Sequence, residues 1–430
     1  MERCNISSCG DCDLISSMPD PILHHILGFL KTKEAVQTCV MSKRWQHLWT
    51  SLASLDFDAQ DFTALEDPKY DSEEEESNDP ERAHDSERFA TFVDMVLLRR
   101  KPVPLDVFRM SFGALDSNYV TFQNWLNYAV QHNPRVVHLD YFCCSLPVCV
   151  YTCTSLEELY IHLYPVQILT LTRRPVVNLP NLKRLSIRND FLTPNQFKDL
   201  LFGCPILEYL WLNRCYFGEE TEIAHESLQH LTIVDSKISF FHASNLLTFY
   251  YISSEATATL DMPSLTYAHL ELKNPMIQYP LVQCWNGLAS FLRGLVNVEV
   301  LELCVPWAQL LEEFVLPELP VYQKMHDLSV GAFCMRLGFF LVTWILWKVP
   351  NLKKLTILQQ SECTGFCCGE EADTSESTDV PLRAAISYCK NLEFVEVKYS
   401  RFDSMLKQLI DALVEGTKEL QNVNIILSKH

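Results

Sequence analysis

The hydrophobic positions divide this chain into a short helical stretch at its beginning and a long leucine-patterned array behind it. From Leu14 to Trp49, aliphatic and aromatic residues recur at the spacing of an amphipathic helix. We expect three short helices, with Pro19 in the first turn of the first and Thr32 and Ser42 as caps of the next two. The stretch holds more apolar surface than such helices bury among themselves, so it is expected to complete its core against another protein. A self-contained bundle, or the capping end of the array, fits the same pattern.

Behind this stretch, the spacing Leu-x-x-Leu-x-Leu recurs, with other aliphatic or aromatic residues allowed. The interval varies from 18 residues (Leu228 to Leu246) to 40 residues (Leu352 to Leu392). The twelve occurrences begin at Val136, Leu156, Leu182, Leu207, Leu228, Leu246, Leu265, Val298, Met325, Leu352, Leu392 and Leu420. Such irregular repetition is typical of leucine-rich repeats, in which strands and return segments stack into a curved solenoid. An ordinary α/β domain with leucine-rich strands is the alternative.

Some return segments carry a helical pattern of their own. The segment 194–201 combines a capping signal with an apolar stripe, and Phe333–Trp347 fits a buried helix between two strands. Near the end of the chain a stripe from Phe402 to Val414 predicts another helix, and Gly416 suits its end. This last strand, helix and strand would form the cap that a solenoid requires.

One face of the array is the candidate binding surface. Side chains alternate along a strand, so residues between the repeated leucines should line the concave face. These are Tyr160, His162, Arg184, Arg188, Tyr209, Trp211, Asn213, His230, Tyr250, Tyr267 and His269. Arginine and aromatic residues are enriched at recognition hot spots, which makes Arg184, Arg188, Tyr209 and Trp211 the candidate target-binding residues. Scattered surface aromatics with solvated arginines are the alternative.

Composition and charge narrow the class of partner. The 430 residues are 48% hydrophobic and carry a net charge of −19, which argues against nucleic acid because phosphate binding needs clustered Lys and Arg. The longest uncharged apolar run, 337–347, is too short to span a membrane. The 17 cysteines are an odd number in apolar contexts, which fits free thiols in a reducing compartment. Proteins are therefore the expected partners.

No enzymatic or cofactor motif stands out. Cys9 and Cys12, and Cys363 with Cys367 and Cys368, each lack the second ligand pair that a closed zinc site needs. Phosphate-loop, dinucleotide-binding, nucleophile-elbow and metalloprotease signatures are absent as well. We therefore expect no catalytic residue, no metal and no cofactor.

An ordered set of residues in the amino-terminal stretch forms a motif. The set is Met18-Pro19-Asp20, Ile22-Leu23, Ile26-Leu27, Phe29-Leu30, Lys33, Ala35-Val36, Ser42-Lys43-Arg44-Trp45 and Leu48-Trp49. It resembles the F-box of plant proteins. Met18 and Gly28 stand where plant F-boxes usually have Leu and Ser. The resemblance implies docking onto the small Skp-family adaptor of a cullin–RING ubiquitin ligase, through an apolar helical surface laid against the partner's helices.

The F-box pattern, carried over position by position, also implies the contact residues. It assigns adaptor binding to Pro19, Ile22, Leu23, Leu27, Val40 and Trp45. For Met18 and Trp49, adaptor contact and internal packing both stay open.

The rest of the chain is similar to plant F-box/leucine-rich-repeat proteins. Pro180-Asn181-Leu182, Cys204-Pro205 and Pro350-Asn351-Leu352 are typical of them, and Leu392–Val397 with Leu409–Leu427 resembles the FBD region that often closes them. The expected fold is α/β: a three-helix F-box, then a right-handed, irregular leucine-rich-repeat solenoid with an α+β cap. The expected layout is a flexible amino terminus over 1–12, F-box 13–52, acidic linker or loop 53–90, array 91–345, and terminal FBD-like repeats 346–430 with an acidic insertion over 361–381.

These resemblances imply the substrate-recognition subunit of a Skp–cullin–F-box ubiquitin ligase, a non-catalytic protein. The F-box would dock the adaptor, and through it the cullin, while the repeats capture a target protein. The alternatives are a small-molecule receptor, similar to the auxin and jasmonate receptor F-box proteins, and an adaptor-bound scaffold outside any ligase. We expect an intracellular protein of the nucleus, the cytoplasm or both.

Overall fold

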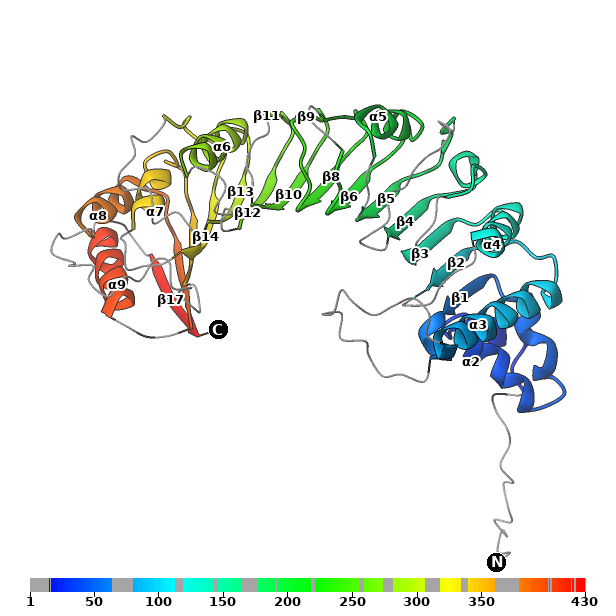
Figure 1. Ribbon diagram of the computed structural model, residues 1–430. Coiled ribbons are helices and arrows are strands. Elements are labelled where there is room, and N and C mark those ends of the chain that lie inside the picture. The colour runs from blue at the N-terminus through cyan, green and yellow to red at the C-terminus, as the bar shows by residue number, and fades with distance from the viewer. Residues whose placement is uncertain are drawn as a thin grey trace, which may run out of the picture. The chain divides into compact units, whose positions relative to one another are not determined.

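The computed structural model shows two compact units, Met1–Ser186 and Ile187–His430. In both, parallel strands alternate with helices (Figure 1). The residues that it describes are 15, 17–63, 80–112, 119–142, 146–163, 176–189, 192–217, 221–254, 259–273, 281–305, 318–333, 339–359, 379–400, 402, 404–418, 420 and 423–429.

The first unit begins with the predicted short helices. They are α1 (Asp20–Leu27), α2 (Thr32–Gln37), and the 3-10 segments η1 (Thr38–Val40) and η2 (Trp45–Ser51). The two predicted caps are wrong: Lys31 precedes α2 as its cap residue, and η2 begins after Arg44 rather than at Ser42. The third predicted helix corresponds to η2, a 3-10 helix whose three residues per turn place Trp45 and Leu48 on one buried face.

The remainder of the first unit is built from repeats. In chain order it contains β1 (Ser54–Asp58), η3 (Ala59–Phe62), α3 (Pro80–Arg99), β2 (Val107–Ser111), α4 (Tyr119–Gln131), β3 (Val136–Phe142), η4 (Val150–Thr152) and β4 (Glu158–Leu163). The strands are parallel and in the order β1-β2-β3-β4, and β5 (Arg184–Arg188) lies at the division between the units. Phe57 of β1 meets Phe92 of α3 at 6.3 Å between ring centroids, so α3 packs on the buried side of the sheet.

Both ends of the segment expected as an acidic linker form regular structure. At one end β1 pairs with β2, and at the other α3 begins at Pro80; the acidic run 64–79 lies outside the described residues. Leu55 and Phe57 are buried because they alternate with Asp56 and Asp58, which face the open side of the sheet. The parallel sheet thus begins at β1, within the segment expected as a linker.

The second unit continues the strand-and-return pattern. Its large sheet has the order β6-β8-β10-β12-β13-β14-β15-β16-β17, with all pairs parallel. These strands are β6 (Tyr209–Asn213), β8 (His230–Val234), β10 (Thr248–Ser253), β12 (Tyr267–Leu272), β13 (Val300–Cys304), β14 (Asp327–Phe333), β15 (Lys354–Gln359), β16 (Phe394–Tyr399) and β17 (Asn424–Lys429). A second sheet, missed by the sequence pattern, joins β7 (Glu222–Ala224), β9 (Phe240–His242) and β11 (Thr259–Asp261).

Helices occupy several return segments of the second unit. They are α5 (Pro194–Phe202), α6 (Leu281–Gly294), α7 (Phe340–Leu346), α8 (Asp379–Tyr388) and α9 (Ser404–Thr417). In Figure 1, α5 and α6 lie on the same side of the strands. The prediction for 194–201 is confirmed, since Thr193 and Gln196 form a capping box at the start of α5. The helices expected within Phe333–Trp347 and after Phe402 are α7 and α9.

Glycine 416 has a different role from the one predicted for it. It lies inside α9, and a Cβ at this position would approach the Cβ of Ile386 to 2.9 Å. Gly416 therefore permits close packing of α8 on α9 rather than ending a helix. Of the expected insertion 361–381, the structure describes only the part from Asp379, which begins α8.

The repeated leucines form rows across the sheet of the second unit. One row runs in register from Leu231 through Phe249, Ala268, Leu301 and Leu328, and all of its members are fully buried. The residues between them are half-buried or exposed, as in β6, where Tyr209, Trp211 and Asn213 alternate with buried Leu210 and Leu212. The predicted alternation is thereby confirmed, and we call the side that carries the intervening residues the open face.

Replacing Leu301 by alanine is expected to lower the free energy of unfolding of this unit by about 2–5 kcal/mol, because the side chain is fully buried between neighbouring rows. Replacing its neighbour Val300, half-buried on the open face, should cost about 1 kcal/mol or less. Chemical unfolding of both variants is the measurement, and equal destabilisation would contradict the assigned faces.

Candidate functional site: an exposed apolar surface on the amino-terminal helices

Helix α1 presents two different apolar faces. Leu23 and Leu27 are fully buried, whereas Ile22 and Ile26 are 46% and 38% exposed. Neighbouring residues of an α-helix point about 100° apart, so the single stripe seen in the sequence divides into an inner pair and an outer pair. Only the outer pair is available to another molecule.

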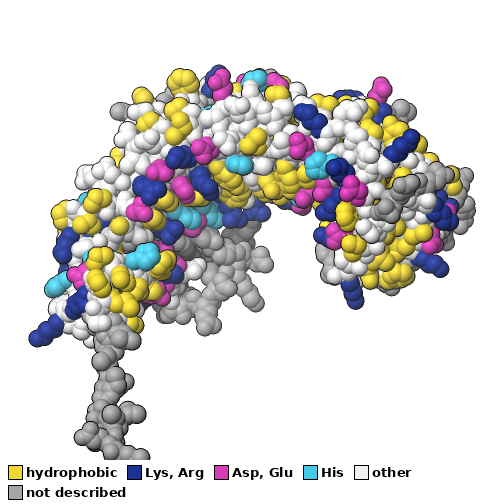
Figure 2. All heavy atoms as spheres, turned by 180° about the vertical axis from the view of Figure 1, so that it is seen from behind, with side chains coloured by type: hydrophobic (Ala, Val, Ile, Leu, Met, Phe, Trp, Pro, Cys, Tyr) yellow, Lys and Arg dark blue, Asp and Glu magenta, His cyan; other side chains and the backbone are white. Residues whose placement is uncertain are grey.

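Further large apolar side chains are exposed close by in the sequence. Phe29 is 78% exposed, just after Gly28 ends α1, and Val40 is 86% exposed at the end of η1. We define the apolar surface as Ile15, Ile22, Ile26, Phe29, Leu30, Val40 and Met41. In Figure 2 hydrophobic side chains gather at the surface of the amino-terminal helices. Exposed apolar patches of this kind mark sites of protein interaction.

The six residues expected to contact the adaptor fall into two groups. Pro19, Ile22 and Val40 are exposed. Leu23, Leu27 and Trp45 are at most 3% exposed and form the interior of the helical module, so in this structure they shape the surface from beneath. Trp49 is buried as well, and Met18 is half-buried. Phe29 and Met41 were not assigned from the sequence, although both are more exposed than Ile22.

An ion pair closes the module beside Pro19. The Arg44 guanidinium donates to Asp20 Oδ1 at 2.6 Å and to the carbonyl oxygen of Met18. The hydrogen bond from Arg44 holds the pKa of the Asp20 carboxyl below its usual value. Arg44 thus fixes the start of α1 against the segment that leads into η2.

The module is also fixed to the first repeat strand. The Thr32 hydroxyl accepts a hydrogen bond from the amide of Asp56 at 2.7 Å, and Lys31 Nζ reaches Asp58 Oδ2 at 2.6 Å and Asp61 Oδ1 at 3.1 Å. The hydrogen bond that Lys31 donates to the Asp58 carboxylate raises the pKa of Lys31. The contacts run from α2 directly to β1 and η3, so the helices and the first strand are one body.

A buried arginine strengthens this attachment. The side chain of Arg100, 6% exposed, donates to the carbonyl oxygens of Leu52 (2.9 Å), Val103 (2.9 Å) and Pro104 (3.1 Å). Leu52 follows η2 and Arg100 follows α3, so one guanidinium joins the end of the helical module to the next repeat. Buried charges are tolerated where their donors are satisfied in this way.

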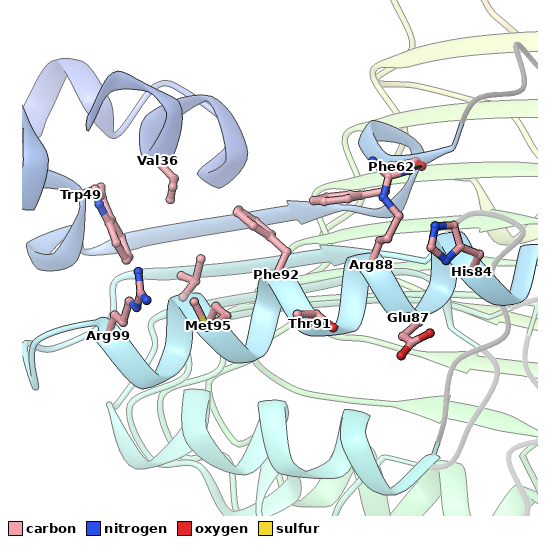
Figure 3. Close-up of a pocket in the computed structure, with 11 residues that line it drawn as sticks. Val36, Trp49, Phe62, His84, Glu87, Arg88, Thr91, Phe92, Met95 and Arg99 are labelled. Carbon is pink, nitrogen blue, oxygen red and sulfur yellow. Dashed lines mark hydrogen bonds between the residues drawn. The ribbon is translucent and has the colours of Figure 1, made fainter. Parts of the chain in front are cut away.

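A groove of about 540 Å³ lies between the module and α3 (Figure 3). Val36, Trp49 and Phe62 line one side, while Phe92 and Met95 of α3 extend toward them in the close-up. The rings of Phe62 and Phe92 are 5.2 Å apart between centroids. Charged and polar side chains of α3 complete the lining: His84, Glu87, Arg88 and Arg99. The groove is mainly apolar, and the ring contact between Phe62 of η3 and Phe92 of α3 forms part of its lining.

The open face carries the predicted target-binding residues in separate units. Arg184, in the first unit, lies 3.8 Å from Glu158 Oε1. Arg188, Tyr209 and Trp211 belong to the second unit and are half-buried. Tyr209 lies 6.0 Å from the ring of His230, another residue predicted for this face. Within the second unit the structure therefore places an aromatic ring of the predicted site beside an imidazole ring on the next strand.

Two parts of the chain match models of known protein families. Residues 15–56 match the family model of the F-box domain, and residues 123–254 match a model described as the leucine-rich repeats of the FBD-associated F-box protein At5g56370. The chain carries an F-box followed by leucine-rich repeats. The amino-terminal helical module lies within the residues that match the F-box, and the predicted α/β fold class, an F-box followed by a leucine-rich-repeat region, is confirmed.

Relatives in Arabidopsis thaliana share this arrangement in their names. The chain is 26% identical over 388 residues to putative F-box/LRR-repeat protein At5g02930. This match covers 84% of the chain and 75% of that protein. It is 28% identical over 386 residues to F-box/LRR-repeat protein At4g14103 (84% and 95%) and 25% identical over 430 residues to F-box/FBD/LRR-repeat protein At5g22660 (91% and 85%). The predicted resemblance to plant F-box/leucine-rich-repeat proteins with an FBD region is confirmed.

The comparisons support a general role. F-box domains in general bind Skp1-type adaptors in Skp–cullin–F-box complexes, and F-box/leucine-rich-repeat proteins are in general non-catalytic subunits that act as substrate receptors. Among the described helices, none is both long and apolar enough to cross a membrane. Among the residues that the structure describes, no three His, Cys, Asp or Glu side chains are grouped as a metal site. The cysteine clusters at Cys9 and Cys363 lie outside the described residues.

Proposed function

We propose that this chain is the substrate-recognition subunit of a Skp–cullin–F-box ubiquitin ligase. The observation that carries the proposal is the apolar surface on a module that matches the F-box. On this surface Phe29 is 78% exposed and Val40 is 86% exposed. Covering such side chains is favourable by about 25 cal/mol per Å² of apolar area removed from water. A helical adaptor laid on this surface would supply the missing cover.

The proposed adaptor contacts are residues of the apolar surface together with Pro19, which lies beside it in the sequence. Ile22 and Val40 would be covered directly by the adaptor, with Phe29 and Met41 beside them. Leu23, Leu27 and Trp45 support these contacts by holding the helices in place. The cullin would be reached only through the adaptor.

The proposed mechanism is proximity rather than catalysis. The F-box holds the chain on the ligase, and the open face of the repeats holds a target protein. The complex thereby raises the effective concentration of the target's lysines near the ubiquitin-conjugating enzyme. No step requires a reactive group of this chain, so it acts as a non-catalytic subunit.

Reconstitution tests this function. The purified chain is mixed with a Skp-family adaptor, a cullin and a RING subunit, and the assembly is followed by size-exclusion chromatography. We expect all four proteins to elute together. A complex with the adaptor that excludes the cullin would instead favour a scaffold outside the ligase, and absence of any complex would refute the proposal.

Target capture through the open face gives a separate prediction. Arg184→Glu combined with Trp211→Ala should lower the yield of a captured target about tenfold or more, since aromatic and arginine side chains dominate recognition. Capture under proteasome inhibition, compared with an F-box-deleted chain, is the measurement. Arg214→Glu with Phe202→Ala is the matched control, because Phe202 is 89% exposed on α5 and Arg214 follows the end of β6. Unchanged capture by the first variant would exclude these residues as contacts.

A further inference from the structure

The open face of the second unit has a distinct chemistry between β10 and β13. Tyr250, Tyr267, His269, Glu271 and Glu302 occupy its outward positions on these strands, and we call them the aromatic–acidic surface. Register places Tyr250 beside His269 and His269 beside Glu302, so three adjacent strands each contribute to one row.

The two tyrosines and the histidine are in direct ring contact. The centroid of Tyr250 lies 5.2 Å from that of Tyr267 and 5.7 Å from that of His269. Tyr250 is 38% exposed, so part of its ring is open to solvent while its neighbours limit its movement. An ordered, exposed aromatic ring is suited to stacking with a cation.

The carboxylate of Glu302 lies at the edge of these rings. His269 Nδ1 is 3.0 Å from Glu302 Oε2, and the Glu302 side chain is 41% exposed. Burial, together with hydrogen bonding to Tyr250 and Glu302, raises the pKa of Tyr267, so its hydroxyl stays protonated and can donate. Glu302 is thereby held in place while part of its carboxylate faces solvent.

The charge of the surface has one sign. The carboxylates of Glu271 and Glu302 both raise the pKa of Cys304, after the larger effect of burial, which shows that they share one environment. The lysines that follow β12 and begin β15 are already paired: Lys273 Nζ lies 2.7 Å from Asp235, and Lys354 Nζ lies 3.6 Å from Asp327. The five residues of the aromatic–acidic surface therefore include two carboxylates and neither lysine nor arginine.

We propose that this surface binds an arginine-containing basic segment of the target protein. The proposal rests on the proposed function, in which the repeats hold a target, and it specifies the chemistry of that target. Arginine fits better than lysine, since a planar guanidinium stacks on tyrosine and donates hydrogen bonds to a carboxylate along its edge in the same pose. The acidic chain as a whole, with a net charge of −19, attracts such a segment at long range.

Peptide binding to the full chain, purified with its adaptor, tests this. The probe is a fluorescein-labelled peptide with four arginines spaced by Gly and Ser, and its anisotropy is measured at 0.15 M salt. Matched peptides carry lysine or glutamate in place of arginine. We expect the arginine peptide to bind most tightly and the glutamate peptide not at all. Equal binding of the arginine and lysine peptides would overturn the arginine assignment.

Variants locate the binding. Tyr250→Ala with Glu302→Gln should weaken arginine-peptide binding about tenfold or more, whereas Tyr250→Phe, which keeps the ring, should retain it. Glu222→Gln with Phe240→Ala is the matched control: it removes the same charge and an exposed aromatic from β7 and β9, where the two residues pair in register. Equal losses in both double variants would show unspecific charge attraction and overturn the proposal.

The same preparations keep the two proposals apart. Thermal unfolding tests whether each variant is folded. Tyr250→Phe is a conservative variant that tests the same position should Tyr250→Ala fail to fold. If wild-type chain assembles with adaptor and cullin but Y250A/E302Q binds the peptide normally, the surface assignment alone fails. If the peptide preference holds but the chain never enters the ligase, the proposed function alone fails.

Discussion

An Ile22→Glu, Val40→Glu double variant is expected to lose the Skp-family adaptor while the chain keeps its fold. Ile22 is 46% exposed and Val40 is 86% exposed, so glutamate is accommodated at both positions in the free protein. In the complex, two carboxylates would be covered by an apolar partner, which costs several kcal/mol per unpaired charge. We expect affinity to fall roughly a thousandfold or more, equivalent to about 4 kcal/mol. Isothermal titration calorimetry with purified adaptor measures it.

Leu98→Glu is the matched control for this loss. Leu98 is 82% exposed, close to the 86% of Val40, but it lies on α3 outside the apolar surface. This variant adds the same kind of charge and should bind the adaptor as wild type does. Normal adaptor binding by a folded I22E/V40E variant would show that the adaptor does not contact these residues.

A Leu23→Ala, Trp45→Ala double variant should lose the adaptor for a different reason. Both residues are buried inside the F-box, at 0% and 3% exposure. Truncating a buried leucine costs about 2–5 kcal/mol and a buried tryptophan about 3–5 kcal/mol, so the pair approaches the whole stability of a small domain. We expect the F-box to unfold, as seen by loss of near-ultraviolet tryptophan dichroism and by proteolysis within its helices.

Ile26→Ala is the comparison for this core variant. Ile26 lies on the same helix, but it is 38% exposed, so its truncation should leave the F-box folded. A folded L23A/W45A variant that fails to bind the adaptor would contradict the division into inner and outer residues. It would return Leu23 and Trp45 to the contact surface that the family resemblance implied.

The positions of the repeat strands were predictable because burial imposes them. All twelve occurrences of the leucine spacing coincide with strands, and every one of these strands except the last, β17, buries alternate apolar side chains. Leu52, Leu55 and Phe57 fit the same spacing, yet β1 was missed because the whole segment 53–90 was assigned to an acidic linker or loop. Those aspartates face the open side, where Asp58 binds Lys31. The negative charge at the start of this segment is therefore compatible with a strand.

The contact residues of the F-box were less accessible to sequence reasoning. Ile22 and Leu23 have nearly the same hydrophobicity, and only the direction in which the rest of the module packs decides which one is buried. Phe29 was overlooked because it follows Gly28 and so falls outside the helical stripe. The second sheet was missed because its strands have three residues each, too few for an alternating pattern.

The attachment of the F-box to the first repeat limits how a bound target could move. Thr32, Lys31 and Arg100 join the two without an intervening flexible segment, through bonds of 2.6–3.2 Å. A target held on β1–β4 would consequently move relative to the ligase only when the adaptor itself moves. Which of its lysines receive ubiquitin would then be set by their position on its surface, more than by their intrinsic reactivity.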